Sequence, residues 1–462
     1  MLFASLDYLI FLPLVVTAYW LTPRRWRNLL LLVASYVFYM WFIPIYGLLI
    51  LGLAIANYAI GLWIERSRHP GRVLALGIAL DLGVLAFFKY TDLVVASAAG
   101  LLRHADWPTL NILLPLGISF FTFEFIHYLV DIRRGSVPIH DFTNFHLFAS
   151  FFPSQIAGPI KRFQPFHAQL IADRPFDIAL FEQGTWLILR GFAKKVVLAD
   201  HLGPIVAGAF APGVVPETVS AWIGIYAFAL QIYFDFSGYT DIGRGSAQLL
   251  GFRLPENFAQ PYFAVGLRDF WRRWHMSLSS WLRDYVYIPL GGNRCGRVRT
   301  GLNLLITMTV GGMWHGAAWH FAVWGSFHGL GLVSQRAASA AAVAGRRMGD
   351  SAIGRGLLAL LTFHLVCLGW VLFRAPDLAV AGRYLLALAG RGGGSVVPSG
   401  PVSFALAVYL VAVVAERWFP SAFGPLLGRR AWPVRAVAYA GLALGSAVLV
   451  PQTIERFIYF QF

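Results

Sequence analysis

The sequence predicts an all-α integral membrane protein that crosses the bilayer roughly ten to twelve times, with further re-entrant or interfacial helices. Composition gives the first reason: 58% of the 462 residues are hydrophobic and 13% are charged, which excludes an ordinary soluble enzyme. The second reason is that apolar runs near the length needed to span a bilayer, about 20 residues, recur along the whole chain.

The expected spans follow these apolar runs in order. They are placed at 6–22, 28–43, 46–64, 72–91, 111–131, 183–199, 218–236, 301–330, 356–373, 402–416 and 434–451. The first run follows MLFASLD directly, without a basic leader region or a small-residue cleavage site. We therefore expect a retained span there and not a signal peptide.

Basic residues give the chain a formal net charge of +15, and many of them gather in alternate short loops. The clusters are Arg24, Arg25 and Arg27; Arg66, Arg68 and Arg72; Arg133 and Arg134; and Lys161 and Arg162. Under the positive-inside rule, this alternation places these loops in the cytoplasm and the N-terminus outside. The membrane thus explains the charge, and no nucleic-acid partner is expected.

The chain divides into three parts that differ in residue composition. Residues 1–110 and 336–462 consist mainly of plain transmembrane segments with few polar groups at membrane depth. Between them, 111–335 is dense in Pro, Gly, His, Trp and ionisable residues. A segment of this composition can lie within the membrane only where its backbone lines a cavity or is buried in protein. We therefore expect the chemistry to belong to this middle part.

The segment FWRRWHMSLSSWLRDYVYIPLGGNR, 270–294, is expected to form an interfacial helix. Its aromatic and leucine side chains recur on one helical face, at Trp271, Trp274, Leu278, Trp281 and Tyr285. An aromatic stripe with flanking arginines is typical of a helix that lies in the membrane interface. His275 sits one turn from Trp271, so its ring can face inward with the stripe.

The segment GGMWHGAAWHFAVWGSFHG, 311–329, places three histidines in a run that otherwise predicts a membrane helix. Two glycine pairs, Gly312 with Gly316 and Gly325 with Gly329, predict close backbone packing. A metal site is not expected, because His315, His320 and His328 lack the spacing that brings ligands to one helical face. Packing, proton relay and acid-base catalysis remain open for His315.

Cysteine usage adds no metal site either. Cys295 and Cys367 are the two cysteines of the chain, too few for a disulfide framework or a thiolate cluster.

Carboxylates at membrane depth can have two roles: they couple ion movement in a transporter, or they form structural contacts. Asp235 and Asp241 end an aromatic span, and a structural role would pair them with Arg244, Arg272 or Arg273. Glu124 and His127 lie at i, i+3 in an apolar span and could bond each other. The prolines and glycine of FFPSQIAGPIKRF, 151–163, indicate a broken or re-entrant segment.

Taken together, these motifs resemble the membrane-bound O-acyltransferase family. The resemblance is carried by 270–294 and by RTGLNLLITMTVGGMWHGAAWHFAVWGSFHG, 299–329. LPLGISFFTFEFIHYLVD, FFPSQIAGPIKRF, GFAKKVVLAD and FDFSGYTDIGRGSAQLLGFRLPENF extend it along most of the chain. More narrowly, the chain resembles the bacterial branch with alginate O-acetyltransferase and the D-alanyl transferase of teichoic acids.

The resemblance implies a central tunnel that an acyl thioester enters from the cytoplasm and an acceptor from outside. It implies His315 as the catalytic base and His275 as a second catalytic group, with Trp314, Asp235 and Arg272 as candidates for the tunnel lining. No permanently bound cofactor is expected, and acetyl-CoA is the expected donor. This function places the chain in a bacterial inner membrane, acting for a surface polysaccharide.

The resemblance also implies a separate extracytoplasmic partner with a serine-hydrolase-like (SGNH-type) site, and the chain itself has no Gly-x-Ser-x-Gly nucleophile motif. Cys295 and Gly296 stand where relatives often carry more basic residues, which leaves the donor-docking surface open. The alternative is a secondary transporter or export scaffold that uses Asp235, Asp241 and Glu124. Matched inverted repeats would favour transport, and the sequence shows none.

Overall fold

The computed structural model of the protein describes residues 1–102, 110, 112–156, 158–341, 351–418, 440–441 and 444–445. Within these ranges, helices joined by turns and loops make up the architecture, with no β-strand. The predicted all-α class is confirmed. The expected span at 434–451 lies, but for a few positions, outside the described residues.

The chain forms two compact units. The first comprises Met1–Ile188 with Thr240–Pro255, and the second comprises Leu189–Tyr239 with Glu256–Phe462. Two helices contribute residues to both units, α9 (Ile178–Phe192) and α11 (Thr218–Leu249). The predicted division at residues 110 and 335 rests on sequence texture and stays a prediction.

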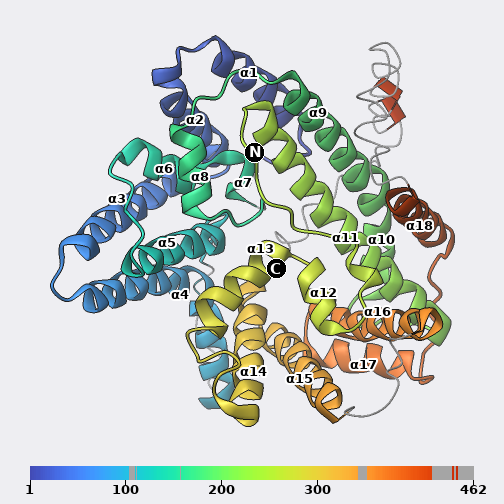
Figure 1. Ribbon diagram of the computed structural model, residues 1–462. Helices are drawn as coiled ribbons and strands as arrows, with labels where there is room; N and C mark the ends of the chain where they lie inside the picture. The colour runs from blue at the N-terminus through green and yellow to red at the C-terminus, as the bar shows by residue number, and fades with distance from the viewer. Residues whose placement is uncertain are drawn as a thin grey trace. The chain divides into compact units, whose positions relative to one another are not determined.

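The first unit contains eight complete helices among the described residues (Figure 1). They are α1 (Leu6–Leu21), α2 (Arg24–Met40), α3 (Ile45–Arg66), α4 (Pro70–Leu102), α5 (Ile118–Arg133), α6 (Phe142–Ser150), α7 (Phe152–Gln155) and α8 (Phe163–Ile171). The short α6, α7 and α8 confirm the broken segment that the prolines and glycine of 151–163 predict.

Local sequence explains where helices of this unit begin. The Ser5 side chain accepts a hydrogen bond from the Tyr8 backbone N–H and caps α1, and Asp141 caps α6 through Asn144 in the same way. The Tyr8 hydroxyl lies 2.7 Å from Ser246 Oγ, which joins α1 to the end of α11. The buried Tyr8 ring packs against Phe38 and so contributes to an aromatic core.

The second unit contains the segments that carry the histidine motifs. Its helical elements are η1 (Ala193–Ala199), α10 (Asp200–Ala209), η2 (Pro261–Phe263), α12 (Leu267–Arg273), α13 (Met276–Leu282), η3 (Arg283–Tyr287), α14 (Gly296–His315), α15 (Trp319–Ala341), α16 (Ala352–Arg374), α17 (Leu378–Leu388) and α18 (Gly400–Trp418). Elements η1 and η3 are π-helical, a rare form found frequently at functional sites.

The prediction of one span at 301–330 is wrong, because α14 ends at His315 and α15 begins at Trp319. A side chain at Gly316 would overlap the Phe321 ring, at 2.0 Å from Cε2. The glycine pairs do produce the predicted close packing, but between these two successive helices. A Cβ at Gly312 would lie 2.2 Å from the Phe321 carbonyl oxygen, and one at Gly325 would lie 2.3 Å from that of Met308.

The prediction of one continuous helix from Phe270 to the helix-breaking Pro-Leu-Gly-Gly is also wrong, while its interfacial location stays a prediction. The chain forms α12, turns at Trp274 and His275, and continues as α13 and η3. His275 has φ 43° and ψ 55°, the left-handed conformation that interrupts a right-handed helix. Regular spacing of apolar side chains did not reveal this break, since the residues of the stripe remain mostly buried on both sides of it.

Four helices in the described part of the chain are long and apolar enough to cross a bilayer. They are α3, α4, α11 and α16. Helices α1 and α17 and residues Gly400–Val411 of α18 are apolar but shorter. These helices agree with the predicted multi-pass membrane class, and the total of roughly ten to twelve spans stays a prediction.

Candidate active site

His275 occupies the turn between α12 and α13, outside the four long apolar helices. Its left-handed backbone is uncommon for a residue with a side chain, and the surrounding contacts hold it in place. The Asn257 carbonyl oxygen accepts from the Met276 N–H at 3.0 Å, and the Asn257 side-chain oxygen accepts from the Ser277 N–H at 3.1 Å. One asparagine therefore fixes the first turn after the histidine.

The imidazole of His275 is fully buried against an aromatic ring. The Phe236 ring lies 4.7 Å from it between centroids, edge to face. Neither ring nitrogen has a hydrogen-bond partner among the described residues. Burial lowers the pKa of His275 to about 3, so the ring is neutral near pH 7. A neutral imidazole has one nitrogen that donates and one that accepts.

His315 is the last residue of α14, so the end of the helix sets its position. Its side chain is buried, with ring centroids 5.1 Å from Trp324 and 5.3 Å from Phe373. These rings come from α15 and α16. The imidazole thus lies among three helices of the second unit, in a site walled mainly by aromatic side chains.

The structure brings the two predicted histidines together. The centroids of the His275 and His315 rings are 6.4 Å apart. The buried Trp314 ring contacts both, at 5.9 Å from His275 and 5.1 Å from His315. The predicted place of Trp314 in a tunnel lining and the roles of both histidines stay predictions.

A further histidine belongs to this cluster and is missing from the site predicted from the sequence. The Trp324 ring lies 5.1 Å from His315 and also 5.1 Å from His328. His328 is fully buried, and Trp271 stands edge to face against it at 5.2 Å. The glycines at 325 and 329, which flank His328 on α15, were the signal that this turn is tightly packed.

The His320 ring lies 4.1 Å from that of Phe321, which in turn packs against Phe373. The His320 Nδ1 lies 3.0 Å from the Leu372 carbonyl oxygen, a backbone contact to α16. The sequence predicted that His315 and His320 lie on different faces of one helix. In the structure they belong to two helices, because α14 ends at His315 and α15 begins at Trp319.

Asp235 lies in a buried ion pair with Lys195, whereas the structural alternative had named Arg244, Arg272 or Arg273 as its partner. Lys195 Nζ lies 3.0 Å from Asp235 Oδ1 and 2.7 Å from Asp200 Oδ1, and the three side chains are almost fully buried. Lys195 belongs to the π-helical η1, and Asp200 begins α10. The sequence GFAKKVVLAD holds both, but nothing in their spacing pointed to Asp235.

The arginines after Phe270 have surface positions. Arg273 Nε donates to Asp269 Oδ1 at 3.0 Å, an i, i+4 pair within α12. Arg272 is exposed, and its proposed place in the tunnel lining stays a prediction.

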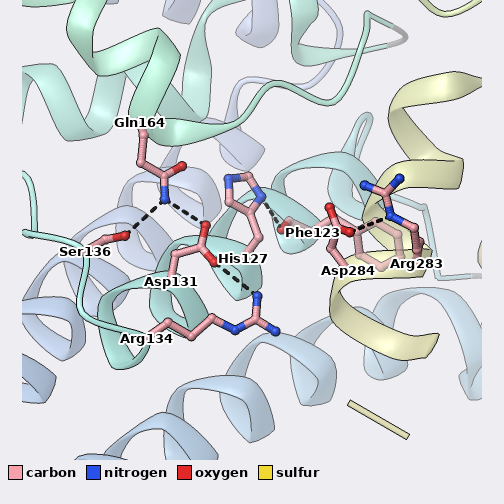
Figure 2. Close-up of polar contacts among 8 residues, drawn as sticks. All are labelled: Phe123, His127, Asp131, Arg134, Ser136, Gln164, Arg283 and Asp284. Atoms are coloured by element: carbon pink, nitrogen blue, oxygen red, sulfur yellow. Dashed lines mark hydrogen bonds and ion pairs between the residues drawn. The ribbon is translucent and has the colours of Figure 1, made fainter. Parts of the chain in front are cut away.

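In the first unit, Glu124 forms a buried ion pair with Lys161 and does not bond His127. Lys161 Nζ lies 2.7 Å from Glu124 Oε1 and 2.8 Å from Oε2. Lys161 is therefore not an exposed loop charge, contrary to its place in the predicted basic cluster. His127 Nδ1 instead contacts the Phe123 carbonyl oxygen at 3.0 Å, as Figure 2 shows.

Figure 2 also shows how neighbouring polar groups of α5 are satisfied. Gln164 donates to the Asp131 carboxylate at 2.9 Å and to the Ser136 hydroxyl at 3.2 Å, and Arg134 pairs with Asp131 at 3.4 Å.

Asp241, the third carboxylate that the transporter alternative would use, is buried in the part of α11 that belongs to the first unit. Glu124 and Asp235 thus each have a structural partner.

Apolar helices define a helical membrane protein, and its second unit holds a buried pair of imidazoles, a group often used for acid-base chemistry. A family model described as the membrane-bound O-acyltransferase family matches residues 105–353. The chain belongs to this family, and it is an O-acyltransferase.

Named relatives support the assignment. The chain is 44% identical to a probable alginate O-acetylase of Pseudomonas aeruginosa, over 83% of this chain and 74% of the relative. It is 34% identical to a peptidoglycan O-acetyltransferase of Helicobacter pylori, over 81% of this chain and 75% of the relative. It is also 34% identical to a teichoic acid D-alanyltransferase of Streptococcus thermophilus, over 49% of this chain and 59% of the relative.

Proposed function

We propose that this O-acyltransferase transfers acetyl groups for the O-acetylation of a cell-surface polysaccharide. The similarity to relatives named for alginate and peptidoglycan O-acetylation covers more than four fifths of the chain, whereas the similarity to the Streptococcus D-alanyltransferase covers about half. Acetyl is therefore favoured over D-alanyl as the transferred group. Alginate, cellulose, another exopolysaccharide and peptidoglycan all fit this class of acceptor.

The proposed donor is a cytoplasmic acyl thioester, with acetyl-CoA first among candidates. Acyl-CoA is charged and stays inside the cell, while a surface polymer is outside, so the acyl group crosses without its carrier. In this proposal the protein lies in a bacterial inner membrane with its N-terminus outside, an orientation that the alternating arginine clusters favour. Final transfer to sugar hydroxyls belongs, in this proposal, to a separate extracytoplasmic SGNH-type partner.

His315 is the proposed general base. Its imidazole takes the proton of an acceptor hydroxyl as the hydroxyl oxygen attacks the thioester carbonyl carbon. The carbon-sulfur bond then breaks, and the thiolate leaves with the proton from the imidazolium. One ester and one thiol result from one alcohol and one thioester, so no oxidant or further reactant is needed. The single observation that supports this step is the buried pairing of His315 with His275.

His275 is the proposed orienting group. A neutral ring without a described hydrogen-bond partner can donate to the carbonyl oxygen as negative charge develops there. The backbone directly after His275 is fixed by two hydrogen bonds to Asn257, which limits movement during the reaction. Preorganised donors of this kind stabilise a transition state because they need no rearrangement.

Cells that lack the protein provide the test. They are complemented with the wild type, His315→Ala or His201→Gln, where His201 is an exposed histidine of the same unit. Ester-linked acetyl in surface polysaccharide is measured together with membrane levels of each protein. We expect acetyl to return with the wild type and His201→Gln alone. Full recovery with His315→Ala at equal protein level would reject the proposed base.

A further inference from the structure

A polar pocket of about 450 Å³ opens on the first unit, apart from the histidine cluster. Its lining residues come from the end of α1, the start of α2 and the segment in and after the last turn of α8. Four arginines line it together with Tyr19 and Asn28: Arg24, Arg25, Arg27 and Arg174. Such a concentration of guanidinium groups around one hollow is suited to an anion.

The positive charge of this pocket is poorly compensated. Asp173 pairs with Arg24 at 3.1 Å, and both side chains are largely exposed, so the pair is weak. Arg25, Arg27 and Arg174 form no ion pair with a carboxylate of the described chain. Burial and the positive charges of Arg27 and Arg24 lower the pKa of Arg174, while Tyr19 acts in the opposite direction.

Two of the arginines are held in fixed positions. The Arg174 guanidinium lies 3.7 Å above the Phe252 ring and donates to the Asn28 side-chain oxygen at 3.3 Å. Its Nε and Nη1 are buried and have no hydrogen-bond partner in the described residues. Arg27 donates to the Arg174 carbonyl oxygen at 3.4 Å and lies over Trp20 at 4.9 Å. The guanidinium groups of Arg27 and Arg174 are therefore preorganised for ligand binding.

Exposed apolar side chains beside the pocket indicate which kind of anion it binds. Leu21 is 81% exposed and Trp26 is 51% exposed, at the adjoining ends of α1 and α2. Farther along α2, Val33 is 56% exposed. Tryptophan and tyrosine next to arginines are typical of the level of the lipid headgroups. A ligand that has both a phosphate and acyl chains matches this combination better than a free anion does.

We propose that this arginine pocket binds the phosphate of an anionic phospholipid, whose acyl chains lie along the exposed apolar faces of α1 and α2. The guanidinium groups form charge-assisted hydrogen bonds to the phosphate oxygens. Basic pockets between membrane helices bind phospholipid headgroups on these physical grounds. The proposal is independent of the acetyl-transfer function and of the roles of His275 and His315.

The test is native mass spectrometry of the full chain in a neutral detergent, titrated with phosphatidylglycerol or phosphatidylethanolamine. The pocket variant is Arg24→Gln with Arg25→Gln, and its control is Arg68→Gln with Arg72→Gln, two exposed arginines of another basic loop. Both variants remove the same charge. A single Arg25→Gln variant covers the case in which the double variant does not fold.

We expect saturable phosphatidylglycerol binding to wild type and control, and binding weaker on the order of tenfold in the pocket variant. Excess inorganic phosphate or coenzyme A should leave the bound lipid in place. Equal losses in both double variants would overturn the proposal in favour of diffuse surface charge. Displacement by phosphate or coenzyme A, or equal binding of phosphatidylethanolamine, would overturn it in favour of a soluble anion or of non-selective lipid contact.

Discussion

The imidazole rings of His275 and His315 lie edge-on with centroids 6.4 Å apart, and Trp314 contacts both. Each ring is placed by an interruption of a helix: His275 by a left-handed turn between α12 and α13, His315 by the end of α14. The pair therefore depends on backbone geometry as much as on the identity of the side chains. This relationship leads to the first prediction.

Replacement of His275 should separate its chemical role from its backbone role. Asparagine tolerates the left-handed region, whereas valine does not. We expect His275→Val to be less stable than His275→Asn by about 1 to 3 kcal/mol, measured by unfolding in detergent. Both variants should lose acetyl transfer. Equal stability of the two would show that the turn does not impose the left-handed conformation.

The close contact of α14 and α15 predicts a strong effect at Gly325. A Cβ there would lie 2.3 Å from the Met308 carbonyl oxygen, and backbone cannot easily move away. We expect Gly325→Ala to destabilise the protein by about 1 to 3 kcal/mol. Gly356→Ala on α16 is the control, because its Cβ meets no neighbour within 4 Å. If the thermal midpoints of both variants match the wild type, the tight packing is disproved.

The buried Lys195 is expected to be essential for folding because it lies between two carboxylates. Lys195→Met would leave Asp200 and Asp235 without this cation and should cost about 3 to 5 kcal/mol. Adding Asp235→Asn to that variant should restore part of the loss, since one buried negative charge is removed. Unfolding curves of the single and double variants measure the difference. A double variant less stable than the single would contradict this account.

His328 is expected to act on the site through Trp324, whose ring contacts it and His315 alike. Its ring nitrogens have no partner among the described residues, so His328→Leu removes no hydrogen bond seen there. We expect the unfolding temperature to hold or rise. Acetyl transfer should fall by roughly tenfold in kcat as the Trp324 ring loosens. An unchanged kcat would exclude a positioning role for His328.

The all-α membrane class was predictable because long apolar runs have few other physical solutions. The interruptions were not. Apolar residues continue through Gly316, Ala317 and Ala318, so hydropathy alone reads α14 and α15 as one span. The glycines predicted close packing correctly, but their spacing does not say which helix they contact.

The candidate site also has features that the sequence predicted and features that it did not. Both histidines were selected because their motifs resemble those of a known family, and the structure places their rings near each other. The partners of buried charges could not be predicted, because Lys161 with Glu124 and Lys195 with Asp235 are far apart in sequence. Lys161 looked like an ordinary loop charge, since neighbouring residues in sequence do not report burial.

The most direct measurement of the central claim is acetyl transfer from labelled acetyl-CoA in isolated membranes that contain equal amounts of wild type, His315→Ala or His201→Gln. If His315 is the general base, transfer by His315→Ala should fall by about a hundredfold or more, while His201→Gln retains the wild-type rate. A wild-type rate in His315→Ala membranes would contradict the assignment of His315 to the chemistry.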